Sequence, residues 1–292
     1  MRIAQMFRPG RPLFSIELYP PKTPDGVQNL KHKLVEIAAH HPDYISVTYG
    51  AAGGTRHTTR EICAFIKQEL GIEAMAHLTC VAHSRGEIRA LLEGLRAEGI
   101  ENIMALRGDP PVGQARFVPP EDGFAYASQL VQAIRALGGF GIGVAGYAEG
   151  HVEAPSYAVS LQHQIAKIRC GADFVVSQLF LDNAHFLRWR DDLRAAGMTV
   201  PIVPGILPAL TAQQIGRFAR LCGARVPDSL RVGLERFEAH PESAAAYGLV
   251  FAMRQIEALL KEGVDGIHLY ALNRLEPIRA VSALVEESRR AG

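Results

Sequence analysis

The strongest constraint on the fold is a repeated alternation of short β-rich segments with longer helical segments. Eight apolar runs, rich in β-branched residues, each precede a stretch with helical periodicity. The expected strands span residues 14–18, 44–48, 74–80, 103–106, 142–146, 174–178, 200–206 and 266–270. The expected helices span residues 27–40, 58–70, 84–98, 124–137, 156–170, 184–196, 212–221, 244–262 and 276–290. This order predicts parallel strands that are joined by helices.

Eight strand–helix units in 292 residues are typical of a (β/α)8 TIM barrel, which we predict as a single domain over residues 1–292. A glycine follows seven of the helical segments, as helix ends require, at positions 71, 99, 138, 171, 197, 223 and 263. Residues 222–243 are expected to add an extra helical segment before the last strand. A doubly wound open sheet is the alternative, since the alternation does not by itself show that the sheet closes.

Composition narrows the kind of ligand. The 31 basic and 30 acidic residues leave a net charge of +1, without the basic field that binds nucleic acid or an anionic membrane. No apolar run reaches the roughly 18–20 residues of a membrane span. The N-terminus lacks the apolar core of a signal peptide, and the four cysteines lie far apart. We therefore expect a cytoplasmic protein that binds small molecules and neither nucleic acid nor a membrane.

Polar residues collect where the expected strands end. The apolar run 103–106 is followed at once by Arg107, Gly108, Asp109 and two prolines, which cannot continue a strand ladder. The other seven ends are also polar, aromatic or rich in glycine and proline. Ligands bind at the carboxyl ends of parallel strands, so the convergence of these segments predicts a binding site there. Taken alone, Arg107 and Asp109 fit a surface ion pair equally well.

Glu17 is the candidate acid. It lies within an apolar strand, between Ile16 and Leu18. A buried carboxylate is costly unless it is paired or protonated, and burial raises the pKa of a carboxyl group, which prepares it to act as a general acid. The alternative is a structural glutamate that is paired with a basic residue of a neighbouring strand.

Three further features carry weaker signals. Residues 50–54 contain three glycines before a helix and suit either a phosphate cradle or a simple turn. The small residues of strand 143–146 would let a flat ligand approach the backbone closely. His77, His83 and His151 have no metal-ligand spacing and no acidic cluster beside them, so we expect no metal site.

Taken together, the strand-end motifs resemble the methylenetetrahydrofolate reductase family in its short bacterial form. The similarity extends over residues 14–274, and the motifs occur in the family's order. They are FSIELYPPK (14–22), VTYGA (47–51), HLTC (77–80), LRGDPP (106–111), YAS (126–128), YAEGH (147–151), QLFLD (178–182), PGILP (204–208) and LNR (272–274). The resemblance implies a flavin-dependent oxidoreductase of one-carbon and methionine metabolism. NAD(P)H would reduce FAD and leave, and methylenetetrahydrofolate would then accept the hydride in the same pocket, which is a ping-pong mechanism.

The resemblance also implies residue roles. Glu17 matches the family's general acid, which helps the folate ring open to an iminium, and it also lies in the substrate site. Asp109 matches the aspartate near the flavin and the pterin. Folate contacts match Gln178, Gln214, Phe218 and Arg274. Flavin contacts match Thr48, His77, Leu106, Arg107, Gly108, Asp109, Tyr126, Ala127, Tyr147, His151 and Lys167. Among these, Arg107 and Lys167 suit the pyrophosphate.

One departure from the family lies in the helix after the fifth strand. Ser160 and His163 stand where the family offers an Asp and an Asn toward the adenosine half of FAD. Two alternatives follow: a flavin-independent reductase with direct hydride transfer, and a folate- or flavin-binding protein without catalysis. The sequence does not distinguish NADH from NADPH as the donor. Relatives form dimers or tetramers, so a homo-oligomer is expected.

Overall fold

The computed structural model describes residues 1–49, 56–110, 113 and 117–291. The expected phosphate cradle or turn at residues 50–54 lies outside these described residues. The strands are β1 (Leu13–Leu18), β2 (Tyr44–Val47), β3 (Glu73–Thr79), β4 (Asn102–Leu106), β5 (Gly141–Gly146), β6 (Phe174–Ser177), β7 (Ile202–Val203), β8 (Gly205–Ile206) and β9 (Gly266–Tyr270). The helices are η1 (Ile3–Gln5), α1 (Pro24–Ala38), α2 (Arg56–Gln68), α3 (Arg85–Ala97), α4 (Ala127–Leu137), α5 (Tyr157–Arg169), α6 (Asn183–Ala195), α7 (Ala212–Cys222), α8 (Asp228–Arg236), α9 (Pro241–Lys261) and α10 (Leu275–Ala291).

The strands form one sheet in the order β7-β6-β5-β4-β3-β2-β1-β9-β8. The pairings from β1 to β5 and between β8 and β9 are parallel. Apart from β7 and β8, which stand at the two ends of this order, strands that follow one another in the chain are neighbours in the sheet, and β9 lies next to β1. A doubly wound sheet would instead reverse its strand order at a switch point. This order confirms the predicted (β/α)8 barrel fold class.

The chain packs into two compact units. Unit 1 comprises Met1–Met6, Ser15–Ala145 and Ala166–Val175. Unit 2 comprises Phe7–Phe14, Gly146–Ile165 and Val176–Gly292.

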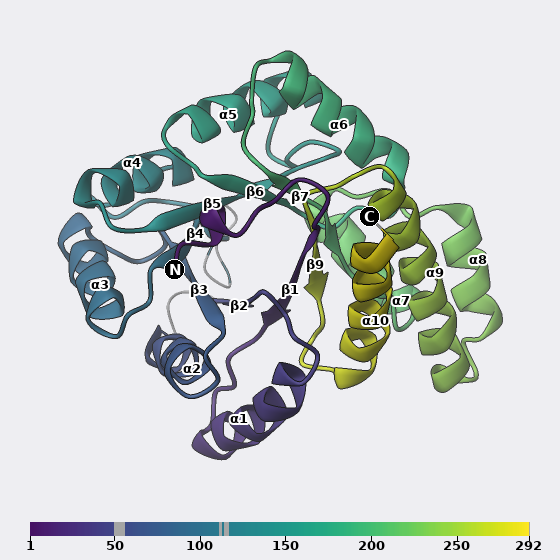
Figure 1. The fold of residues 1–292 in the computed structure, drawn as a ribbon. Coiled ribbons are helices and arrows are strands. Elements are labelled where there is room, and N and C mark those ends of the chain that lie inside the picture. Colours follow the sequence, from purple (N-terminus) through teal and green to yellow (C-terminus); the bar gives the residue numbers. More distant parts are fainter. Residues whose placement is uncertain (50–55, 111–112, 114–116, 292) are drawn as a thin grey trace. The chain divides into compact units, whose positions relative to one another are not determined.

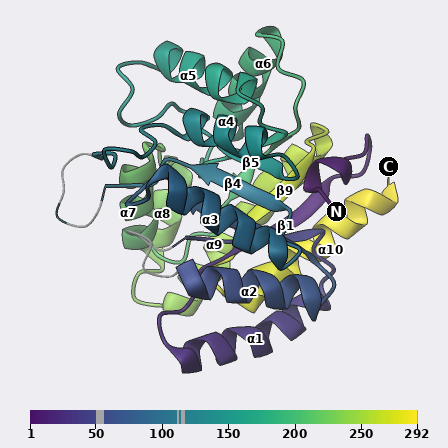
Figure 2. The same cartoon turned by 90° about the vertical axis from the view of Figure 1, so that its left-hand side faces the viewer.

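In unit 1, helices α1, α2 and α3 cover the outside of the first strands (Figure 1), and the second view shows the three helices side by side (Figure 2). Helix α1 begins at Pro24, earlier than the expected residue 27, because the Thr23 side chain accepts a hydrogen bond from the Gly26 amide and Pro24 suits the first helical turn. Leu30, Leu34 and Ile37 are buried on one face of this helix.

The other face of the unit 1 strands is filled by large apolar side chains. The rings of Tyr44 and Phe174 meet edge to face, with centroids 6.3 Å apart. A Cβ atom at Gly143 would lie 2.8 Å from Cζ of Phe174 and 3.4 Å from the sulfur of Met75. Gly143 therefore makes room for the Phe174 ring. At Gly143 the space beside the backbone is occupied by this ring, so the expectation of a flat ligand is wrong for this glycine, and for the rest of strand 143–146 it stays a prediction.

In unit 2, the predicted extra helical segment is confirmed as α8, which lies beside α7 and α9 (Figure 1). Helix α8 buries Leu230 and Leu234, one turn apart, in an apolar cluster with Ile215 of α7. Burial of each leucine stabilises the fold by about 1.5–3 kcal/mol. The extra helix is thus part of the core of unit 2.

The expected strand 200–206 is divided into β7 and β8 by Pro204. Proline has no N–H to donate, so it interrupts the ladder. Its carbonyl still accepts a hydrogen bond from the His268 amide at 2.9 Å. The next residue, Gly205, donates its N–H to Oγ of Ser177 at 2.9 Å.

The predicted glycine helix ends are confirmed, since all seven glycines have positive φ angles between +66° and +116°. In unit 1, side chains of α2, α3 and α4 also donate hydrogen bonds to carbonyl groups just after the end of the following helix. Gln68 of α2 donates to the Glu98 carbonyl after α3, Arg96 of α3 donates to the Gly138 carbonyl after α4, and Arg135 of α4 donates to the Gly171 carbonyl after α5. The positive charges of Arg96 and Arg135 also interact favourably with the negative ends of the helix dipoles.

No helix in the part of the chain that the structure describes is both long enough and apolar enough to cross a membrane.

Candidate active site

Glu17 lies one residue before the carboxyl end of β1 and is only 7% exposed. Its Oε2 atom is 3.4 Å from Nε2 of His77, and the same nitrogen is hydrogen-bonded to Oγ of Ser46 at 2.6 Å. Both partners are also buried. We call these three side chains, from β1, β2 and β3, the polar row. An imidazole that touches a carboxyl group can hold or return a proton, so the row has the composition of an acid–base site.

In β2 and β3, apolar residues precede the polar residues of the row. Side chains two residues apart in a strand share a face, and two residues before Ser46 and His77 come Tyr44 and Met75. The face therefore changes from apolar to polar toward the carboxyl ends of the strands, where barrel proteins place their reactions.

The turn after β4 brings the next predicted residues into a fixed shape. Leu106 ends the strand, and Gly108 has a φ of +86°. A Cβ atom at Gly108 would lie 2.6 Å from Cγ2 of Val81, so only glycine fits this turn. Arg107 is half-buried, donates to the Gly108 carbonyl and lies over the Phe117 ring at 5.4 Å. Asp109 is exposed.

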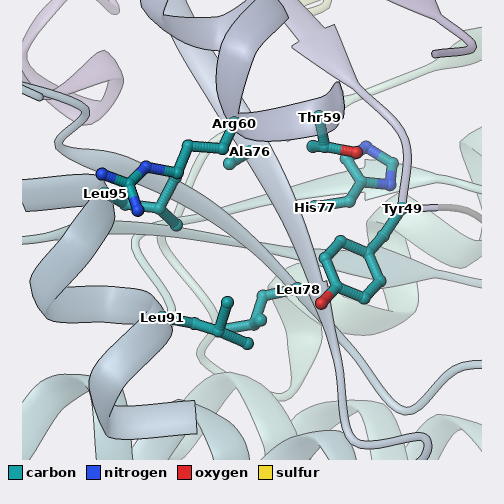
Figure 3. Close-up of a pocket in the computed structure, with 8 residues that line it drawn as sticks. All are labelled: Tyr49, Thr59, Arg60, Ala76, His77, Leu78, Leu91 and Leu95. Carbon is teal, nitrogen blue, oxygen red and sulfur yellow. The ribbon is translucent and has the colours of Figure 1, made fainter. Parts of the chain in front are cut away.

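Thr48 follows β2 and is held by two hydrogen bonds. Its N–H donates to the Leu18 carbonyl at 2.9 Å, and its carbonyl accepts from the Thr59 hydroxyl of α2 at 2.9 Å. A small pocket opens here, lined by Thr59, Tyr49 and His77 and otherwise mainly by leucines and an arginine (Figure 3). This pocket has His77 and Tyr49, the residue after Thr48, in its lining.

Three further predicted flavin residues belong to unit 1. Tyr126 is exposed and precedes α4, of which Ala127 is the first residue. Gln129 caps this helix by accepting hydrogen bonds from the amides of Ala125 and Tyr126, which is why α4 begins later than the expected residue 124. Lys167 of α5 donates to the Ala145 carbonyl at 2.5 Å, and burial lowers the pKa of its amine to about 8.

In unit 2, the loop after β5 carries Tyr147 and His151, whose rings meet edge to face with centroids 4.7 Å apart. Ser160 and Gln164 of α5 hold this loop. The His151 amide donates to Oγ of Ser160 at 2.9 Å, and the Tyr147 amide donates to Oε1 of Gln164 at 2.8 Å. His163, also predicted at this site, is exposed on the same helix.

Gln178 follows β6, and its side chain accepts a hydrogen bond from the Leu179 amide at 2.8 Å. Next to it, the Ser177 carbonyl accepts from the Tyr270 hydroxyl at 2.7 Å. A Cβ atom at Gly205 would lie 2.3 Å from that carbonyl. Gly205 is therefore needed for the close approach of β8 to the end of β6.

The remaining predicted folate residues also lie in unit 2. Gln214 is in the first turn of α7, and its Oε1 accepts from the Leu210 amide at 2.9 Å. Phe218, one turn later, packs against the apolar cluster of unit 2. Arg274 follows β9 and donates to Glu276 at 3.2 Å. The two residues before Arg274, Leu272 and Asn273, have φ angles of +51° and +57°, and such strained backbone is often found at functional sites.

Among the described residues, no three His, Cys, Asp or Glu side chains are grouped closely enough to hold a metal ion. Cys80 lies near Arg107 but is no nucleophile at neutral pH, because burial raises the pKa of its thiol to about 12 and outweighs the opposite effect of Arg107.

Sequence reasoning missed Ser46 and Gln164. Ser46 was signalled only weakly, as a polar residue inside the apolar strand 44–48. Gln164 is 3% exposed and also accepts a hydrogen bond from Nε1 of Trp189 at 3.1 Å. This contact joins two helices, and no local sequence motif predicts it.

The fold and the polar strand ends define a (β/α)8 barrel protein with candidate site residues at and near the carboxyl ends of its strands. The comparison with known families is more specific. The sequence profile of the family described as methylenetetrahydrofolate reductase matches residues 2–286. The chain therefore belongs to the methylenetetrahydrofolate reductase family.

Individual relatives agree. The chain is 40% identical over 283 residues to methylenetetrahydrofolate reductase (NADH) 1 of Arabidopsis thaliana, which covers 93% of this chain and 48% of the plant protein. It is 38% identical over 269 residues to the 5,10-methylenetetrahydrofolate reductase of Pectobacterium carotovorum subsp. carotovorum, which covers 91% of this chain and 88% of the bacterial protein. The chain thus spans about half the length of the plant relatives that it matches.

A solved structure from Clostridium thermocellum, of a protein described as binding two copies of 5-methyl-5,6,7,8-tetrahydrofolic acid, superimposes with a TM-score of 0.62. The alignment covers 97% of this chain and 96% of that one at 15% sequence identity, so this likeness shows the fold alone.

Proposed function

We propose that this chain reduces 5,10-methylenetetrahydrofolate to 5-methyltetrahydrofolate with NAD(P)H, using FAD in a ping-pong mechanism. The observation that carries the proposal is the buried carboxyl group of Glu17 in contact with His77, in a chain of this family. Glu17 contacts an imidazole, and an imidazole can exchange a proton near neutral pH.

The overall reaction needs one hydride and one proton. Opening the five-membered ring of the substrate releases a nitrogen that must be protonated, and the exposed iminium carbon then accepts the hydride. In our proposal Glu17 Oε2 gives the proton to that nitrogen. His77 Nε2, 3.4 Å away, returns a proton to the carboxylate, and the Ser46 hydroxyl fixes the imidazole.

The residues present fit a flavin dinucleotide. In unit 1, Lys167 and Arg107 offer two cations for a pyrophosphate, and Gly108 exposes backbone where a side chain would not fit. Asp109 supplies a negative charge that would tune a nearby flavin. A bound FAD would supply the hydride relay between NAD(P)H and folate.

Other residues would hold the cofactor and the substrate. Thr48, His77, Leu106, Tyr126, Ala127, Tyr147 and His151 remain the proposed flavin contacts. The Ser160 hydroxyl accepts a hydrogen bond from the His151 amide. Ser160 would therefore contribute to flavin binding by holding the loop that carries His151. Gln178, Gln214, Phe218 and Arg274 remain the proposed folate contacts.

The test is the visible absorption spectrum of the purified protein, recorded anaerobically before and after addition of NADH or NADPH and then of methylenetetrahydrofolate. The proposal expects a flavin spectrum that bleaches with the nicotinamide and returns with the folate. A flavin that neither NADH nor NADPH reduces would refute the proposal that NAD(P)H is the electron donor. A colourless protein with full activity would instead support direct hydride transfer, and a colourless inactive protein a binding role.

A further inference from the structure

The loop between β5 and α5 contains a buried carboxylate that has no role in the mechanism above. Glu149 has a side chain that is only 8% exposed. Both of its oxygens accept from the backbone N–H of Arg225, each at 3.2 Å. Nε2 of His185, on α6, lies 3.6 Å from its Oε2. All of these groups belong to unit 2.

The same loop touches the end of α7 at a second point. Gly223 caps α7 with a φ of +75°. A Cβ atom there would lie 2.8 Å from Cγ1 of Val152, so the loop packs directly on the backbone of the helix cap. Arg225, whose amide Glu149 binds, is two residues further along. The loop is thus attached to the end of α7 by one polar and one apolar contact.

The partners of Glu149 show that position matters more than charge. The Arg225 guanidinium is 4.0 Å away and its side chain is 82% exposed, so this ion pair contributes little. The backbone amide is the closer partner. A buried carboxylate costs free energy unless it is hydrogen-bonded, and an apolar residue would stabilise the loop at least as well. What the carboxylate adds is a fixed position of the loop relative to the cap of α7.

We propose that Glu149 is a positioning residue that locks the loop carrying Tyr147 and His151 to α7, the helix carrying Gln214 and Phe218. The identity of the two ligands rests on the proposed function, since Tyr147 and His151 are proposed flavin contacts and the α7 residues are proposed folate contacts. Through Glu149, ordering of the flavin-binding loop orders the folate-binding helix, and each ligand strengthens the binding of the other.

The test compares Glu149→Ala, Glu149→Asp and Glu149→Gln in the full chain, with Glu235→Ala as the matched control. Glu235 is a carboxylate of α8 whose partner is the side chain of Arg231 at 3.0 Å, so its removal changes charge without touching the loop. Gln keeps an acceptor oxygen at the same reach, whereas Asp keeps the charge but is one methylene too short.

The first readout is amide hydrogen exchange of the purified protein, which does not depend on activity. We expect Ala and Asp to speed exchange about tenfold both in residues 147–153 and in residues 219–226, because a lost hydrogen bond to a charged group changes local opening by at least that factor. Gln and the Glu235 control should leave both segments near the wild-type rate. Faster exchange in only one segment, or rescue by Asp and not by Gln, would overturn the proposal.

The second readout is the affinity for FAD and for 5-methyltetrahydrofolate, each measured with and without the other. In the wild type each ligand should tighten the other, and Glu149→Ala should remove this coupling while Glu149→Gln restores it. Unchanged coupling in Glu149→Ala would also overturn the proposal. If the wild type binds neither ligand, the proposed function fails, while the exchange result still decides whether Glu149 joins the two segments.

Discussion

Nε2 of His77 lies 3.4 Å from Oε2 of Glu17 and 2.6 Å from Oγ of Ser46, so one imidazole nitrogen contacts both of the other polar side chains of the row. The nitrogen can donate to only one of them at a time. If the carboxyl group is protonated, it can share its proton with the imidazole, and if it is ionised, the imidazole N–H can turn to it. This arrangement lets Glu17 recover from His77 the proton that it gives to the substrate, and the imidazole must then take up a proton from solvent before the next turnover.

Glu17→Gln should abolish folate reduction and leave oxidation of NAD(P)H by a quinone nearly unchanged. The amide cannot give up a proton, and only the folate half-reaction needs one. General acid catalysis contributes roughly 10²–10⁴-fold, which sets the expected loss. Stopped-flow measurement of each half-reaction checks this prediction. Loss of both activities would show that Glu17 serves the fold or the flavin instead.

Gly108→Ala should destabilise the protein far more than Gly71→Ala. Both glycines have positive φ, +86° and +67°, so both substitutions carry backbone strain of about 1–2 kcal/mol. An added methyl at Gly71 meets open space, whereas at Gly108 it would lie 2.6 Å from Val81. Urea unfolding of the two variants isolates the steric difference. Equal losses of stability would contradict the close packing of the β4 turn.

Lys167 should make flavin binding depend on pH. Burial lowers the pKa of its amine to about 8 in the protein without cofactor, and a phosphate beside it would favour the charged form. FAD affinity should therefore fall about tenfold between pH 7 and pH 9. Lys167→Arg, which stays charged, should remove most of this dependence. An identical pH profile in the arginine variant would exclude Lys167 as the phosphate partner.

The same amine affects stability in the opposite direction. Below pH 8 it is charged in both the folded and the unfolded chain, so folding bears the full cost of burying the charge. Above pH 8 the folded protein releases the proton while the unfolded chain keeps it until about pH 10.5, so the stability of the cofactor-free protein should rise across this window. Lys167→Met should abolish the rise, as measured by urea unfolding at several pH values.

Arg96→Ala should cost stability without changing activity. The Arg96 guanidinium donates to the carbonyl of Gly138 at the end of α4 and lies 4.9 Å from the Phe140 ring centroid. Loss of these contacts should lower the free energy of unfolding by about 1–3 kcal/mol. Arg89→Ala, an exposed arginine on the same helix, is the control and should cost less than about 0.5 kcal/mol. A fall in kcat for Arg96→Ala alone would refute a purely structural role.

The sequence predicted the order and type of the elements because strands, helices and glycine ends each leave a local signal. It predicted their boundaries less well where a side chain acts at a distance. Gln129 shifts the start of α4 by capping amides four and three residues earlier, and Pro204 divides the expected seventh strand. Gln129 acts through two hydrogen bonds and Pro204 through a missing N–H, and the periodicity of apolar residues reports neither.

Within the site, Glu17 was found as a carboxyl group in an apolar strand, but its contact with His77 was not predicted. That contact depends on how three strands align side by side, a property of the register and not of any one segment. Glu149 was quoted only as part of a motif, because its partner at Arg225 is a backbone amide 76 residues away, and a backbone amide has no signature in the sequence.

The change from an apolar to a polar layer within two residues of β2 and β3 also bears on how such a protein can acquire new chemistry. In β2 the apolar Tyr44 precedes the polar Ser46, and in β3 the apolar Met75 precedes the polar His77. The apolar and the polar positions are different residues of the same strands. The polar residues can therefore be substituted, by evolution or by design, while the apolar residues keep the barrel stable.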